Sequence, residues 1–154
     1  MATAGTDGPT YPRFAPHAWL LAAVGVAMVL VGFYFIFLRP PLLPEDLRFM
    51  AVSREQLQAV APRLVLWLRW VFTVLGGNMA GIGMLLVHLA FGAFAERKRH
   101  ALAAAAGAGT VSIGLMSVVN VFINSDFKLA LLGLTTLWAA ALACAFPRSG
   151  SNAR

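Results

Sequence analysis

The chain has 154 residues, of which 60% are hydrophobic and only 12% are charged, and its mean hydropathy is +0.77. A soluble domain carries about 25% charged residues, so this composition excludes an ordinary soluble enzyme and indicates one integral membrane domain. The formal net charge of +6 does not indicate nucleic-acid binding, because the basic residues are expected in short loops beside membrane spans.

Four long apolar stretches make up most of the sequence. A bilayer core of about 30 Å needs about 20 helical residues to cross it, and each stretch is near that length. We therefore predict an all-α integral membrane protein with four transmembrane helices in an antiparallel bundle. The predicted spans are residues 18–38, 64–95, 101–123 and 129–146, which together form a membrane domain over 18–146.

The N-terminal segment 1–17 contains Pro9, Pro12 and Pro16 and is expected to be irregular. The first span has 21 apolar residues. A signal-peptide core has about 7–15, so this span is expected to be retained as a helix. At the other end of the chain, 147–154 is predicted to be a C-terminal tail.

The segment 39–63 between spans 1 and 2 is predicted to hold two short interfacial helices. Arg-Pro-Pro at 39–41 ends the first span, because proline lacks the amide donor that a helix needs. Pro-Glu-Asp at 44–46 is a favourable helix start, and Ser53 followed by Gln56 has the spacing of a capping box. The segment is either a lid over a cavity or a connector that rests on the lipid headgroups, and we favour the connector.

The other two connections are short. Residues 96–100 form a basic turn between spans 2 and 3, and residues 124–128 join spans 3 and 4, so both pairs are expected to be antiparallel neighbours. An even number of spans places both termini on one side of the membrane. Lys and Arg divide six against six between the two sides, and the compact basic turn, which is hard to translocate, favours cytoplasmic termini. Ten arginines against two lysines, with abundant Ala and Leu, suggest a bacterial protein, so the predicted location is the bacterial cytoplasmic (inner) membrane.

Small residues are expected to join the helices. Lipid is as apolar as leucine, so burial alone does not associate membrane helices, whereas small residues let their backbones approach. Gly77 and Gly81 form a Gly-x-x-x-Gly motif, and a stripe of small residues follows span 3. We expect spans 2 and 3 to pack together through these faces, in preference to a homodimer. The glycines assigned to helix packing are Gly76, Gly77, Gly81, Gly83, Gly107 and Gly114.

Polar residues within or beside the spans are the candidates for a functional site, because an ionisable group at membrane depth usually faces the bundle interior. His88 is the deepest, and we expect it to bond a hydroxyl of span 3 or span 4. Arg69 enters from the opposite side, where it either pairs with Asp126 or the loop acids or places its head among lipid phosphates. The candidate polar or ligand-lining residues are Arg69, His88, Asn120, Asn124 and Asp126.

No catalytic motif, metal cluster or nucleotide-binding loop stands out, so we predict no catalytic residue, no metal and no cofactor, and do not expect an enzyme. A bis-histidine haem site would need two of His17, His88 and His100 at matching depth, and their depths differ. The single cysteine, Cys144, excludes an internal disulfide.

The second span carries a glycine-rich pattern that resembles a known family. It reads Arg-Trp-Val-Phe-Thr-Val-Leu-Gly-Gly-Asn-Met-Ala-Gly-Ile-Gly at 69–83, after Arg-Pro-Pro-Leu-Leu-Pro at 39–44. Over 18–146 the chain resembles small four-helix bacterial membrane proteins of the DoxX-like type. The resemblance implies the four-helix fold; most such proteins are uncharacterised, some are linked to quinone-coupled sulfur oxidation, and no catalytic residue transfers. The residues that match the family pattern are Arg69, Gly76, Gly77, Gly81 and Gly83.

The predicted function is that of a non-enzymatic accessory or structural subunit that binds a membrane protein or lipid. Its expected partners are the lipid bilayer and either another membrane protein or further copies of the chain, and no nucleic acid. Two alternatives stay open. A small transporter or channel could be lined by Arg69, Asn120 and His88, although no span holds the acidic residue that proton-coupled transporters commonly use. A quinone-associated redox subunit could hold its quinone near Trp67, Trp70 and Arg69.

Overall fold

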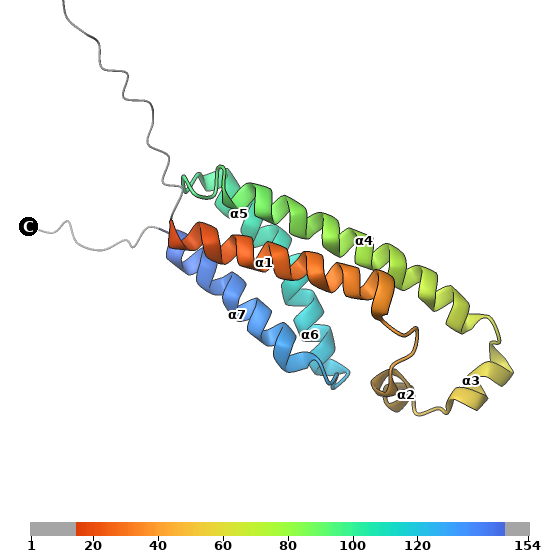
Figure 1. Ribbon diagram of the computed structural model, residues 1–154. Coiled ribbons are helices and arrows are strands. Elements are labelled where there is room, and N and C mark those ends of the chain that lie inside the picture. The colour runs from red at the N-terminus through yellow and green to blue at the C-terminus, as the bar shows by residue number, and fades with distance from the viewer. Residues whose placement is uncertain (1–14, 147–154) are drawn as a thin grey trace, which may run out of the picture.

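The computed structural model describes residues 15–146, and every regular element in this range is a helix (Figure 1). Four helical stretches are long and apolar enough to cross a membrane, which confirms that part of the prediction. The first consists of α1 (Pro16–Phe33) and the π-helical turn η1 (Tyr34–Leu38), and the second is α4 (Leu64–Ala90). The third consists of α5 (Arg99–Gly109), the π-helical segment η2 (Thr110–Gly114) and α6 (Leu115–Phe122), and the fourth is α7 (Lys128–Ala145).

The third and fourth stretches differ from the predicted spans by one or two residues at each end, and two other helix ends differ for identifiable reasons. α1 begins at Pro16 rather than at residue 18, because proline is well suited to the first turn of a helix. α4 ends at Ala90 rather than at residue 95, because the chain turns so that Phe94 enters the core. The Phe94 side chain is fully buried, and its ring lies 5.6 Å from the ring of His17. Residues 1–14 of the predicted N-terminal segment and the whole tail 147–154 lie outside the described residues.

α1 is the central helix, and it packs against α4 on one side and α7 on the other (Figure 1). Glycines bring α1 and α4 into backbone contact. A Cβ added at Gly83 would lie 2.5 Å from the carbonyl oxygen of Gly25, and one added at Gly32 would lie 2.6 Å from the carbonyl oxygen of Gly76. Cβ atoms do not approach other atoms this closely, so the contact requires glycine at each of these positions.

The predicted packing between spans 2 and 3 is wrong. α4 has two small-residue faces, and it presents the face with Gly76 and Gly83 to the glycines of α1. The face with the Gly-x-x-x-Gly motif is therefore left without a partner in the described chain, and Gly114 meets only a backbone atom of its own helical stretch. A Cβ added at any of the following residues would meet no described atom within 4 Å: Gly77, Gly81 and Gly107.

The third long stretch is held to α7. The Ser117 hydroxyl donates to the carbonyl oxygen of Leu131 at 3.0 Å and lies 2.6 Å from the Thr135 hydroxyl. Farther along the pair, the indole N–H of Trp138 donates to the carbonyl oxygen of Ala105 at 3.0 Å. Hydrogen bonds between helices add to close packing in a membrane environment, and here they fix the register of α5–α6 against α7.

Two short helices connect α1 to α4, as predicted. They are α2 (Pro44–Met50) and α3 (Arg54–Val60). At the start of α2 the Asp46 carboxylate accepts a hydrogen bond from the Leu43 amide at 2.8 Å. α3 has the predicted capping box, in which the Ser53 hydroxyl accepts from the Gln56 amide at 3.2 Å and the Gln56 side chain accepts from the Ser53 amide at 2.8 Å. The two helices differ in burial, because α2 buries Glu45 whereas α3 buries no residue.

Candidate functional site

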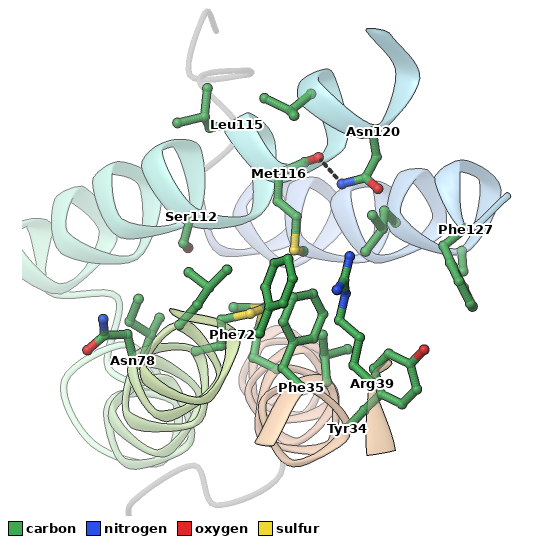
Figure 2. A pocket seen from close by; sticks show the side chains of 18 of the residues that line it. Tyr34, Phe35, Arg39, Phe72, Asn78, Ser112, Leu115, Met116, Asn120 and Phe127 are labelled. Atoms are coloured by element: carbon green, nitrogen blue, oxygen red, sulfur yellow. Dashed lines mark hydrogen bonds between the residues drawn. The ribbon is translucent and has the colours of Figure 1, made fainter. Parts of the chain in front are cut away.

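A cavity of about 850 Å³ lies between the α1–α4 pair and the α6–α7 pair (Figure 2). Its walls come from α1, η1, α4, η2, α6 and the first turn of α7, and α2 covers one end. Most of the lining side chains are aliphatic, aromatic or methionine. The polar side chains in the lining are Tyr34, Arg39, Glu45, Asp46, Asn78, Ser112 and Asn120.

The cavity forms because the helices that would close it diverge. α4 follows α1 through the glycine contacts, whereas α6 follows α7 through the hydrogen bonds of Ser117, and the two pairs separate toward the α2 end (Figure 1). Leu75 of α4 and Leu115 of α6 line the cavity and are still 43% and 58% exposed, so the cavity opens sideways between these two helices.

Both π-helical segments border the cavity. η1 contributes Tyr34 and Phe35 to its lining, and η2 contributes Val111 and Ser112. A π-helical turn inserts an extra residue, which shifts the side chains that follow it, and such turns are frequent at functional sites. Their position here agrees with a site built between these two stretches.

Arg39, directly after η1, places a buried cation in the cavity lining together with Glu45 and Asp46 of α2. Figure 2 shows its side chain beside Phe35 and Tyr34. Its side chain is only 8% exposed, and its Cζ lies 3.7 Å from the ring centroid of Phe72 and 5.3 Å from that of Phe35. Nη2 lies 3.3 Å from Oδ2 of Asp46, and Nη1 donates to the carbonyl oxygen of Pro40 at 2.9 Å. A desolvated cation–π contact contributes about 2 kcal/mol, so stacking and ion pairing together fix the guanidinium in place.

α2 closes this end of the cavity because it is fastened to the turn between α6 and α7. Glu45 is 4% exposed, and its carboxylate accepts from the Ser125 hydroxyl at 2.7 Å and from the Asp126 amide at 3.4 Å. An exposed ion pair between Arg48 and Asp126, at 3.2 Å, adds little to this. The arrangement favours the lid interpretation for α2 and leaves the exposed α3 as a connector.

Among the five polar residues predicted for the site, Asn120 does line the cavity, and its side-chain amide donates to the carbonyl oxygen of Met116 at 2.8 Å (Figure 2). Arg69 is exposed, and no side chain among residues 15–146 pairs with it. The predicted ion pair of Arg69 with Asp126 or the loop acids is therefore wrong. Asp126 pairs with Arg48, and Asp46 pairs with Arg39. The alternative, a head group of Arg69 among lipid phosphates, stays a prediction.

Two further predicted residues lie away from the cavity. His88 is exposed on α4, so the expected hydrogen bond to span 3 or span 4 is wrong; α4 is rotated so that this face points away from those helices. Asn124 lies in the turn after α6 with a positive φ of 54°, and its side-chain oxygen accepts from the ammonium of Lys128. Its role is to shape that turn.

Three charged residues of the site were not singled out from the sequence as its lining. From the sequence, Arg39 is predicted only to end the first span, and Glu45 and Asp46 are predicted to start a short helix and to be possible partners of Arg69. One signal was present: Phe35 and Arg39 are four residues apart, a spacing that places both on one side of a helix. The contact with Phe72 depends on tertiary structure and has no local signal.

The polar groups of the cavity lining are few. Within residues 15–146, no group of three His, Cys, Asp or Glu side chains could hold a metal ion. The lining supplies apolar walls, one cation, two carboxylates, two amide side chains and two hydroxyl groups, and among the described lining residues there is neither a cysteine nor a histidine.

Comparison of the chain with protein-family models, with curated proteins and with solved structures finds no match in any of the three. The resemblance to DoxX-like proteins therefore rests on its motif residues alone. In the structure two of these, Gly76 and Gly83, make the contact with α1, whereas Gly77 and Gly81 have no neighbour within the described part of the chain.

Proposed function

We propose that the chain is a multi-pass protein of the bacterial cytoplasmic membrane that binds a lipid-like molecule in the cavity and performs no reaction on it. In this proposal the four long helices span the bilayer as an antiparallel bundle, with both termini in the cytoplasm. The observation that carries the proposal is the cavity itself, about 850 Å³ in volume, apolar along most of its length and charged at one end only.

The size and position of the cavity suit such a ligand. Ligand sites have volumes of roughly 300–1,000 Å³, mainly apolar walls and a few placed polar groups. With the helices across a bilayer, the opening between α4 and α6 faces the acyl chains, so a molecule can enter from the membrane. The charged end lies where the first span ends, next to α2, which is the level expected for a headgroup.

Binding without chemistry is consistent with an accessory subunit. The lining holds one buried cation, Arg39, whose contacts with Phe72 and Asp46 fix its position. Such preorganisation lowers the entropy loss of binding, because the recognition group is already in place before the ligand arrives. A subunit of this kind would hold or present a lipid to another membrane protein.

Two matched variants in η2 test the proposal. The Ser112 hydroxyl donates to the carbonyl oxygen of Ala108 at 2.6 Å and lines the cavity, while the Thr110 hydroxyl donates to that of Ala106 at 2.8 Å and is exposed outside it. Ser112→Trp and Thr110→Trp therefore lose equivalent hydrogen bonds and gain the same ring. Only Ser112→Trp places that ring in the cavity.

The measurement is native mass spectrometry of protein purified in mild detergent at native expression level, with extraction of what co-elutes. Wild type and Thr110→Trp are expected to carry a bound lipid-like mass, and Ser112→Trp is expected to lose it. A wild-type protein with an empty cavity, or equal retention by both variants, would contradict the proposal.

A further inference from the structure

The charged end of the cavity carries more negative than positive charge. Among the described lining residues, the charged side chains are Arg39, Glu45 and Asp46, so one cation faces two carboxylates. Asp46 already pairs with Arg39 at 3.3 Å. Both oxygens of Glu45 accept hydrogen bonds from the α6–α7 turn. The formal charge of this end is therefore −1.

An anionic headgroup would be poorly accommodated here. It would have to compete with Asp46 for Arg39 while lying near a second carboxylate, and charges within a buried site are screened much less than charges in water. The guanidinium nevertheless has donors to spare, because it carries five N–H groups and its hydrogen bonds to Pro40 and Asp46 use two of them.

The opposite wall of the cavity adds a second hydrogen-bonding group for a headgroup, and this one is uncharged. The Asn120 amide uses one N–H on the Met116 carbonyl oxygen, and its own carbonyl oxygen remains an acceptor. In Figure 2 the Arg39 side chain extends from the α1 side toward the helix that carries Asn120. This end of the cavity thus offers donors and an acceptor together, without a surplus positive charge.

We infer that the cavity selects an uncharged glycerolipid, a molecule with hydroxyl or ester oxygens at its head and an acyl chain along the apolar walls. A head oxygen accepts from Arg39, and a head hydroxyl donates to Asn120 or to the Asp46 carboxylate. The inference rests on the proposed function, because it names the ligand class of the same cavity.

The test compares two probes that differ by one phosphate group, 1-oleoylglycerol and 1-oleoylglycerol 3-phosphate. Each is titrated into the full-length chain in an uncharged mild detergent, and the bound fraction is measured by native mass spectrometry. We expect the uncharged lipid to bind at least about tenfold more tightly, as one unfavourable charge contact in a partly shielded site would cause.

Matched variants show whether the cavity carboxylates cause this preference. Asp46→Asn removes one lining carboxylate and frees Arg39, so the preference for the uncharged lipid is expected to shrink or reverse. Asp126→Asn removes a carboxylate that lies outside the lining, so the ratio of the two affinities is expected to stay at its wild-type value. If Asp46→Asn does not fold, the wild-type ratio decides alone.

The outcomes separate the inference from the function on which it rests. Equal or tighter binding of the phosphate probe, abolished by Ser112→Trp, would overturn the uncharged-lipid inference and keep the cavity as a lipid site. If neither probe binds, or if Ser112→Trp does not reduce the binding of either, both the uncharged-lipid inference and the proposed function are overturned.

Discussion

Replacing Gly83 by alanine tests the contact that places α4 against α1. The added Cβ would lie 2.5 Å from the carbonyl oxygen of Gly25 and 2.7 Å from the amide nitrogen of Val29, whereas ordinary Cβ contacts begin at 3.4 Å. The nearest atoms belong to the backbone, so no side-chain rotation relieves the clash. The two helices must therefore separate locally, because the distance from the added Cβ to the Gly25 carbonyl oxygen is 0.9 Å shorter than an ordinary contact of 3.4 Å.

The magnitude follows from a matched control. Overpacking of this kind costs about 1–3 kcal/mol. Gly77→Ala adds the same methyl group on the same helix where no described atom lies within 4 Å of it. Both variants gain the helix propensity of alanine, which is about 1 kcal/mol better than that of glycine. The difference between their unfolding free energies therefore measures the clash and is expected to be about 1–3 kcal/mol.

Reversible unfolding by SDS in mild-detergent micelles, followed by far-ultraviolet circular dichroism, gives the two free energies. Gly83→Ala is expected to be less stable than Gly77→Ala, which should match or exceed the wild type. Equal stabilities, or a less stable Gly77→Ala, would refute the reasoning, because the Gly-x-x-x-Gly face of α4 would then be a packed one.

Two further pairs of variants test the α2 lid and the contact between α5 and α7. Glu45→Gln removes a buried carboxylate that accepts two hydrogen bonds, so α2 is expected to be destabilised by about 1–3 kcal/mol and to exchange its amide hydrogens faster. Arg48→Gln breaks only an exposed ion pair and is expected to cost less than about 1 kcal/mol. A larger loss of stability for Arg48→Gln than for Glu45→Gln would contradict the role given to burial. Gly109→Ala places a methyl group where the indole of Trp138 lies and is expected to lower the midpoint of thermal unfolding. In Gly107→Ala the added methyl group meets no atom of another described element, so the midpoint is expected to stay at the wild-type value. Equal midpoints for the two variants would exclude the close contact between Gly109 and Trp138.

The helices were predictable because their signals are local. The apolar runs set the length of each span, and the prolines after residue 39 ended the first one. The pair Ser53 and Gln56 marked the start of α3 through hydrogen bonds that span three residues. The end of α4 was misplaced because it depends on Phe94 finding a place in the core, which is a tertiary effect.

The packed face of α4 was not predicted, although the sequence holds a signal for it. Gly25 and Gly32 are seven residues apart, as are Gly76 and Gly83, and this equal spacing lets two antiparallel helices meet glycine to glycine at two levels. The Gly-x-x-x-Gly motif predicts packing through the neighbouring face of α4, the one with Gly77 and Gly81, which has no partner among the described residues. A motif on one helix does not identify its partner, whereas matched spacing on two helices does.

The cavity could not be derived from the sequence, because it is defined by helices that do not pack. Arg39 belongs to it only through a π-helical turn and through the ring of Phe72, which follows much later in the chain. Asn120 was predicted as a candidate on polarity alone, and it does line the cavity. Arg69 and His88 were candidates for the same reason and lie outside it, so polarity within a span is a weak guide to which face is enclosed.

The central position of α1 has a consequence for the order in which the molecule is assembled during synthesis. α1 is made first, and its glycine face can be covered once α4, ending at Ala90, has followed it. Its other face is covered only when α7, the last helix to be made, has followed. Ala130 and Leu131 of α7 form part of the cavity wall. The cavity is therefore completed last, and a nascent chain that has not reached residue 128 holds the α1–α4 pair without it.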